Sequence, residues 1–116
     1  MNNLEVCASD YFEFEGNNFT MLPQNITHLF IGNYCKAKIS NLPSSVTHLM
    51  FGDLFNRNAQ LTHNIIHVVF GSNYNQPTIL PANIEFVSFG NAYNKSTILP
   101  PYTKFVSFGE KYNKPA

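Results

Sequence analysis

A repeat of 19 to 20 residues constrains the fold of this chain more than any other feature of its sequence. Residues 80–98 read LPANIEFVSFGNAYNKSTI, and the residues that follow read LPPYTKFVSFGEKYNKPA. Equivalent leucines stand at positions 22, 42, 61, 80 and 99. A period near twenty with matching apolar positions is typical of a solenoid, in which each repeat is one structural unit stacked on the next. The sequence therefore predicts a repeat protein.

Each repeat places its apolar residues at fixed distances from the opening leucine. The residues seven and nine positions after it are two apart and mostly β-branched or aromatic, as in Val87 and Phe89. This spacing predicts a short strand with both side chains in a core. A glycine follows every such strand, as Gly90 does here, which indicates either positive φ or a close approach of two backbones. The eight or nine remaining residues are too few and too proline-rich for a helix, so we expect an extended or 3₁₀ return path.

These patterns predict a mainly β fold, a right-handed leucine-rich-repeat-like parallel β solenoid with little or no α-helix. We expect a single domain with a degenerate N-terminal cap over residues 1–21, where the alternation at 11–15 predicts an edge strand. The five repeats are expected to occupy residues 22–41, 42–60, 61–79, 80–98 and 99–116.

Charge and composition argue against several classes of partner. The seven Lys and Arg balance the seven Asp and Glu, so we expect no basic surface for nucleic acid. No apolar run approaches the roughly 18 residues of a membrane span, and the first residues lack a signal-peptide pattern. We therefore expect a cytoplasmic protein that binds neither nucleic acid nor membrane. Of the two cysteines, Cys35 falls at an aromatic position of the other repeats and is expected in the core, and a disulfide with Cys7 is not favoured.

The pattern L-P-x-x-[IV]-T-H-L-x-F-G-x-x-[FY]-N-x-P, which runs through about residues 22–116, closely resembles the FNIP repeat. This repeat is a relative of the leucine-rich repeat found mainly in amoebal and giant-virus proteins. The resemblance implies a leucine-rich-repeat-like solenoid and a cytoplasmic location, in the host if the protein is viral. Many members of the family carry an N-terminal F-box that docks a ubiquitin-ligase scaffold. Only 21 residues precede the repeats here, and we expect no F-box among them.

In a leucine-rich arrangement the residues between the two core positions of each strand, and those just before them, face outward. Because parallel strands stack about 4.8 Å apart, equivalent residues of successive repeats become direct neighbours. Aromatic residues and methionine on such a face are typical of protein contacts. The predicted protein-binding residues are Thr27, His28, Phe30, Thr47, His48, Met50, His67, Val69, Phe86, Ser88 and Phe105.

The row of three histidines also raises the question of a metal site. Zinc needs ring nitrogens that converge on one point about 2.1 Å away, whereas rings in a flat row lie parallel. We therefore predict no metal and no cofactor. A catalytic site is not expected either, because outside 11–15 no two carboxylates fall at matching repeat positions and no serine has a recognisable base.

We thus predict a non-enzymatic protein–protein interaction scaffold that binds an unknown protein through the exposed face of its strands. Two alternatives remain: a structural or degenerate remnant of a longer repeat protein, such as a ubiquitin-ligase substrate adaptor without its F-box, or, more distantly, a carbohydrate-acting β-helix enzyme. We also expect self-association through the C-terminal edge, where the strand at 105–108 has no later repeat to pair with.

Overall fold

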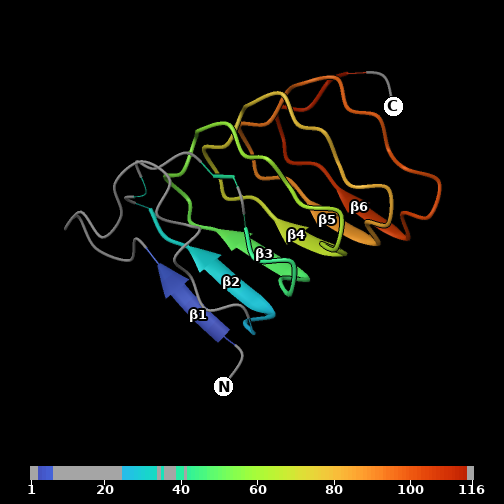
Figure 1. The fold of residues 1–116 in the computed structure, drawn as a ribbon. Helices are drawn as coiled ribbons and strands as arrows, with labels where there is room; N and C mark the ends of the chain where they lie inside the picture. The colour runs from blue at the N-terminus through green and yellow to red at the C-terminus, as the bar shows by residue number, and fades with distance from the viewer. Residues whose placement is uncertain (1–2, 7–24, 34, 36–38, 41, 115–116) are drawn as a thin grey trace.

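The computed structural model describes residues 3–6, 25–33, 35, 39–40 and 42–114. Six short strands form one sheet in the order β1-β2-β3-β4-β5-β6, and every neighbouring pair is parallel (Figure 1). The strands are β1 (Asn3–Val6), β2 (His28–Ile31), β3 (His48–Phe51), β4 (His67–Val69), β5 (Phe86–Ser88) and β6 (Phe105–Ser107). No helix occurs in the described part of the chain. The predicted parallel β solenoid is therefore confirmed, and β2 to β6 fall one in each predicted repeat.

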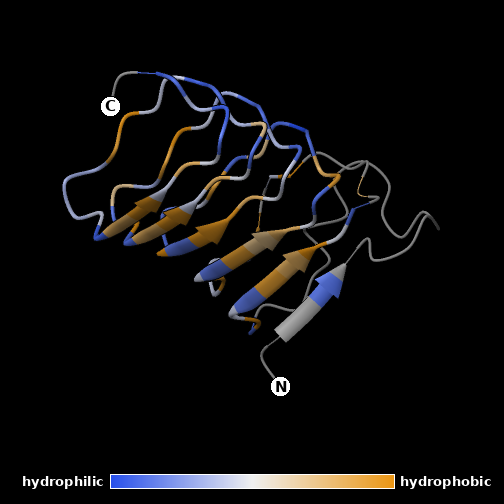
Figure 2. Cartoon of the chain, turned by 180° about the vertical axis from the view of Figure 1, so that it is seen from behind, coloured by the Kyte–Doolittle hydropathy of each residue, from blue (hydrophilic) through white to orange (hydrophobic). Residues whose placement is uncertain are grey.

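The strands stack in register, so that each repeat presents the same position to the next. His28 pairs with His48 and His48 with His67, and the inward Leu29, Leu49 and Val68 follow in the same way. Residues at the two predicted core positions are buried from β2 to β5, while those of β6 are half-buried. Figure 2 shows that β2 to β6 are largely hydrophobic, whereas much of the chain that returns from one strand to the next is hydrophilic.

Two columns of aromatic rings fill the core behind the strands. One column holds Phe51, Phe70, Phe89 and Phe108, with ring centroids 5.1, 5.1 and 5.4 Å apart and planes within 4°. The second column holds Phe55, Tyr74, Tyr93 and Tyr112, at separations of 6.4, 6.0 and 6.0 Å. Offset stacking of this kind adds about 0.5–1.5 kcal/mol per pair to the gain from burial. The repeat period is therefore also the period of a continuous aromatic core.

The hydroxyls of two buried tyrosines are hydrogen-bonded within their own repeats. Tyr74 bonds Thr78 at 2.6 Å, and Tyr93 bonds Thr97 in the same way. Because each threonine hydroxyl donates to a backbone carbonyl two residues earlier, the tyrosine hydroxyl is the donor to the threonine. Burial raises the pKa of Tyr74 to about 12, so this core stays uncharged at ordinary pH.

The glycine after each strand allows two backbones to approach closely. A Cβ at Gly90 would lie 2.7 Å from the carbonyl carbon of Gly71 and 2.7 Å from the Cα of Ser72. Of the two reasons considered for this glycine, close approach is the one that the structure supports. The return path beyond it is extended and interrupted by turns, with an isolated bridge between Ile39 and Ala59 and no 3₁₀ segment among the described residues.

Asparagine side chains hold successive return paths together. Asn56 Oδ1 accepts a hydrogen bond from the backbone N–H of Asn75 at 2.9 Å, Asn75 Oδ1 accepts one from Asn94 at 2.9 Å, and Asn94 Oδ1 accepts one from Asn113 at 3.1 Å. Each asparagine side-chain oxygen therefore serves as the acceptor for a backbone N–H that has no strand partner in the return path. The repeat pattern alone did not predict this ladder.

Replacing Asn75 by alanine should lower the free energy of unfolding by about 1–3 kcal/mol. The change removes the side-chain oxygen that accepts a hydrogen bond from the Asn94 N–H. Because Asn94 is half-buried, its N–H would be left as a donor without a partner. Urea denaturation measures the effect, and Asn83→Ala, at an exposed position, is the control. Equal midpoints for the two variants would show that the ladder adds nothing to stability.

The structure contains an N-terminal strand that the repeat pattern did not predict. β1 spans Asn3–Val6 and pairs with β2, so that Asn3 lies opposite His28. The strand predicted at 11–15, and Cys7, lie outside the described residues. The distance of 25 positions from Asn3 to His28 breaks the repeat period, which is why counting repeats did not find β1. Cys35 is buried in the core, as predicted.

Candidate functional site

The outward face of the sheet carries an unbroken column of five rings, which we call the ring column: His28, His48, His67, Phe86 and Phe105. Successive centroids lie 4.2, 5.0, 4.2 and 4.7 Å apart, and all four pairs are stacked. The in-register pairing of the strands places each ring over the next. The predicted row of histidines therefore exists, and it continues into two phenylalanines.

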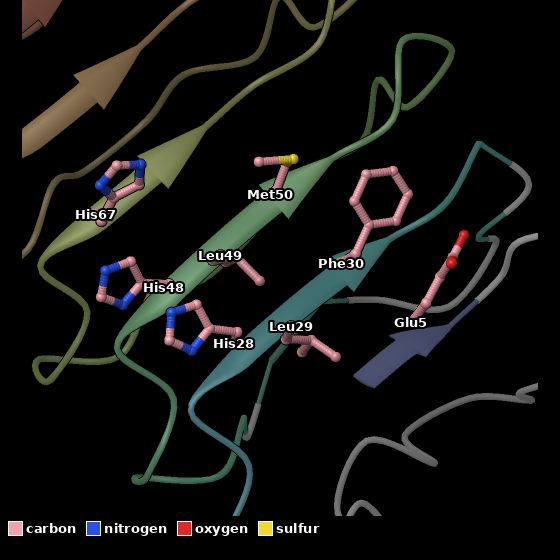
Figure 3. A pocket seen from close by; sticks show the side chains of 8 residues that line it. All are labelled: Glu5, His28, Leu29, Phe30, His48, Leu49, Met50 and His67. Carbon is pink, nitrogen blue, oxygen red and sulfur yellow. The ribbon is translucent and has the colours of Figure 1, made fainter. Parts of the chain in front are cut away.

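A groove of about 570 Å³ runs beside the histidine half of the ring column. Its lining residues are Glu5, His28, Leu29, Phe30, His48, Leu49, Met50 and His67. The side chains of Leu29 and Leu49 are buried in the core, so they contribute only the groove floor. Figure 3 shows the three imidazoles on one side and Phe30 and Met50 on the other, with Glu5 at the end nearest β1.

Threonines orient two of the three imidazoles. Thr27 Oγ1 and His28 Nδ1 share a hydrogen bond of 2.8 Å, and Thr47 Oγ1 and His48 Nδ1 share one of 2.9 Å. His67 follows Ile66, which has no hydroxyl to play this part. The hydrogen bonds fix the ring orientation and engage Nδ1, so the opposite edge of each of these two rings, with Nε2, is the edge turned away from the threonine.

Two of the groove histidines, His48 and His67, favour the neutral form. Partial burial lowers the pKa of His48 below its usual 6.5, and the neighbouring His28 and His67 lower it further. The pKa of His67 is lowered in the same way, first by burial and then by His28. Both effects disfavour a charged ring, since desolvation and a like charge each penalise protonation. At neutral pH the part of the groove wall formed by His48 and His67 is therefore uncharged.

Mild acid should destabilise the fold through these rings. A histidine whose pKa is lowered on folding binds protons more weakly than in the unfolded chain, where the pKa is about 6.5. Their contribution to stability is thus fully present above about pH 6.5 and is lost as the pH falls toward the lower folded values. The charged groups described nearby are Glu5 at the groove end and the Glu85–Lys104 pair farther along the face.

Urea midpoints at about pH 7.5 and about pH 5.5 test this expectation. The wild-type midpoint should fall in acid, and the variant His48→Ala, His67→Ala should fall less. His63→Ala is the control, because His63 is exposed and lies outside the strands. An equal fall in the wild type and in the double variant would exclude these rings as the cause.

The geometry of the ring column does not bring ligands together around a metal. Stacked rings hold their nitrogens in successive parallel planes, and in the described part of the chain no three His, Cys, Asp or Glu side chains are placed to hold an ion. The Glu85 carboxylate lies 3.5 Å from Lys104 Nζ, and both side chains are exposed, so this pair adds little to stability.

All eleven predicted site residues lie on or directly before β2 to β6, and their strand register brings them to one face. Of these, His28, Phe30, His48, Met50 and His67 line the groove. The other six surround it or extend the face toward β6. Glu5 was missed, because β1 was not predicted.

Outside this face, two isoleucines are the most exposed large apolar side chains described. Ile79 is 89% exposed and Ile98 is 90% exposed, at the same position of successive repeats. The repeat alignment would have shown that they match, but not that they point outward. We call these two exposed side chains, Ile79 and Ile98, the isoleucine surface, and it is the alternative to the ring column and groove as a contact surface.

Comparison with known proteins supports the fold and the repeat type. Residues 17–54 match the family described as FNIP Repeat. The chain is also similar to the crystal structure of CroV588, a giant-virus protein described as a novel circular leucine-rich-repeat protein, with 28% identity and a TM-score of 0.59. That match covers 79% of this chain and 18% of CroV588, so the chain spans about a fifth of the matched protein's length. No curated protein matches the chain.

No helix long and apolar enough to cross a membrane is present among the residues described. The repeat period, the stacked parallel strands and the family match agree with one another. The chain is thus a leucine-rich-repeat-like β solenoid, and its residues 17–54 are similar to the FNIP repeat.

Proposed function

We propose that this chain is a non-enzymatic protein-binding module that contacts its partner through the strand face, the surface formed by the ring column and the groove beside it. The observation that carries the proposal is the groove itself, whose apolar wall of Phe30 and Met50 faces a wall of stacked imidazoles. Met50 is 44% exposed although it lies at the centre of the sheet. Aromatic side chains and methionine are enriched at protein interfaces.

Rigidity also supports a binding role for this face. Each ring stacks on rings of the adjacent strands, and the threonine hydrogen bonds fix the orientation of two of them. A preorganised surface loses little side-chain entropy when it binds, so more of the contact energy contributes to affinity. Solenoids commonly use such extended repeat surfaces for binding. A cytoplasmic location belongs to the same proposal, on the ground of the low cysteine content.

Partner capture from a cell lysate at about pH 7.5 tests this function. The triple variant His28→Ala, His48→Ala, His67→Ala removes one wall of the groove and should no longer capture the partner. The three substituted side chains are not part of the buried core, so we expect the fold to be retained. The matched control, Ile79→Ala with Ile98→Ala, removes two exposed apolar side chains elsewhere and should retain capture. The opposite result, loss in the control and retention in the triple variant, would assign binding to the isoleucine surface.

Capture by the wild type should weaken at about pH 5.5, because protonated imidazoles would add charge to an apolar contact. The triple variant should show no such change in any binding it retains. Circular dichroism of the wild type and of the triple variant should be recorded at each pH. Unchanged spectra would show that the lost binding comes from the groove and not from unfolding.

A further inference from the structure

The groove of the strand face runs across the strands rather than along one of them. Its lining residues come from four neighbouring strands, β1 to β4. The register places Glu5 opposite Phe30 and Phe30 opposite Met50, and Val69 follows in the same row of side chains. Because parallel strands lie about 4.8 Å apart, this row extends over about 14 Å. A ligand in the groove therefore meets an acidic group at one end and apolar groups after it.

Glu5 gives this row one charged end. Its side chain is exposed, and the other described residues that line the groove carry apolar side chains or imidazoles. The pKa values of His48 and His67 are lowered, so these two rings do not offset the carboxylate with positive charge at neutral pH. Farther along the same face, Glu85 has a cation of its own, because its carboxylate lies 3.5 Å from Lys104 Nζ. The charge at the Glu5 end of the groove is thus complementary to a cationic group of a ligand.

The neighbour of Glu5 favours one kind of cation. Figure 3 shows the Phe30 ring beside the Glu5 side chain, on the adjacent strand. The Phe30 side chain is half-buried, so part of its surface is open to a ligand. A guanidinium group is planar, pairs with a carboxylate through two N–H groups and stacks on aromatic rings, whereas an ammonium group is a compact, strongly hydrated charge. A carboxylate next to an aromatic ring therefore suits arginine better than lysine.

The rest of the row fits the side chains of an extended segment. Side chains on one face of an extended peptide recur about every 6.7 Å. An arginine at Glu5 would place the next such side chain about 6.7 Å along the row, between Phe30 at about 4.8 Å and Met50 at about 9.6 Å. The one after that would lie about 13 Å along, near Val69 at about 14 Å. An arginine with two apolar residues at the next alternate positions thus matches the groove.

We propose that the groove binds an extended protein segment that carries an arginine at the Glu5 end and apolar side chains at the next two alternate positions. The guanidinium group lies between the Glu5 carboxylate and the Phe30 ring, and the apolar side chains cover Met50 and its neighbours in the row. This inference rests on the proposed function, because it names the kind of segment that the partner presents. A segment can enter the row in either chain direction, so the test uses both.

Fluorescence anisotropy with synthetic peptides that carry an uncharged dye tests the proposal. The probes are Gly-Arg-Thr-Leu-Thr-Leu-Gly and its reverse, Gly-Leu-Thr-Leu-Thr-Arg-Gly, each acetylated and amidated so that arginine is the only charged group. The matched control peptides carry citrulline, which has the shape of arginine without its charge. One of the arginine peptides should bind at least about fivefold more tightly than its citrulline counterpart, and the difference should shrink as the salt concentration rises.

Substitutions at Glu5 test whether the carboxylate itself makes this contact. Glu5→Gln should bring the arginine and citrulline peptides to equal affinity, because it removes the charge and keeps the size of the side chain. Glu85→Gln is the matched control and should keep the preference for arginine. Glu85 directly precedes β5, which lies four strand spacings or about 19 Å from β1, beyond the range of screened charges. In Glu5→Arg the preference should reverse toward a peptide with glutamate in place of arginine.

Met50→Ala separates this inference from the proposed function. It should weaken the arginine and the citrulline peptide alike, because both keep the apolar side chains. Equal affinity of the two peptides for the wild type would overturn the arginine inference, and weaker binding of both by Met50→Ala would still support the groove as the contact surface. Arginine-dependent binding that stayed unchanged in Glu5→Gln and in Met50→Ala would contradict both proposals. If neither arginine peptide bound, this inference would be overturned, and lysate capture would still test the proposed function.

Discussion

Replacing Phe89 by alanine should lower the free energy of unfolding by about 3–5 kcal/mol. The ring is 3% exposed and lies within three stacks, at 5.1 Å from Phe70, 5.4 Å from Phe108 and 3.8 Å from Tyr93. Its loss would leave a cavity inside a column that cannot collapse without shifting two repeats. A domain of this size has only about 5–15 kcal/mol of stability in total, so the loss is a large part of it.

Urea denaturation measures this change directly. Tyr102→Ala serves as the control, because it also removes an aromatic ring but one that is 71% exposed. We expect the midpoint of the control to stay near that of the wild type. If both variants melted at the same urea concentration, the aromatic column would not be the core of this protein.

Replacing Gly90 by alanine should cost about 3 kcal/mol or more, at the upper end of what overpacking costs. The added Cβ would lie 2.7 Å from backbone atoms of both Gly71 and Ser72, and these atoms belong to the neighbouring repeat. Such a clash can be relieved only by moving one repeat away from the other, which would also lengthen the strand hydrogen bonds.

Gly52→Ala is the matched control for this prediction. The nearest atoms to a Cβ at Gly52 belong mainly to the side chain of Asn33, which can rotate away, although it would then lose its 3.1 Å hydrogen bond to Leu54 N–H. The control should therefore be destabilised less than Gly90→Ala in the same urea titration. The reverse order would show that close backbone approach is not what requires the glycine.

The period of the sequence predicted the core because equivalent positions of successive repeats are buried in the same way. Once Phe89 is assigned inward by its spacing from Val87, the same assignment follows for Phe51 and Phe70, and all three are buried. The glycine was also predicted, although the sequence left two reasons for it open. The outward row of histidines followed from the same register and is present in the structure.

Features that depend on exact atomic positions were not predictable from the period. The asparagine ladder needs Oδ1 of one repeat within hydrogen-bond distance of a backbone N–H in the next, and asparagine is also common in ordinary turns. The hydrogen bonds from Tyr74 to Thr78 and from Tyr93 to Thr97 depend on atomic positions in the same way. The burial of the two tyrosine rings, in contrast, follows from the repeat position that they share with Cys35.

The groove could be predicted only in part, because one of its ends comes from a strand outside the period. Glu5 lies opposite Phe30 in the register of β1 and β2, but the spacing between those strands is longer than a repeat. A single carboxylate in an irregular segment gives no sequence signal of its own. The apolar wall of Phe30 and Met50, in contrast, follows from the repeat alone.

The central claim is that the strand face, rather than the isoleucine surface, contacts the partner. Photocrosslinking in lysate tests it most directly, with a photoreactive phenylalanine analogue at position 50, in the groove, or at position 98, where Ile98 is 90% exposed. We predict a discrete crosslinked product from position 50 that is absent from position 98 and that disappears when the three groove histidines are replaced by alanine. A product from position 98 and none from position 50 would contradict the claim.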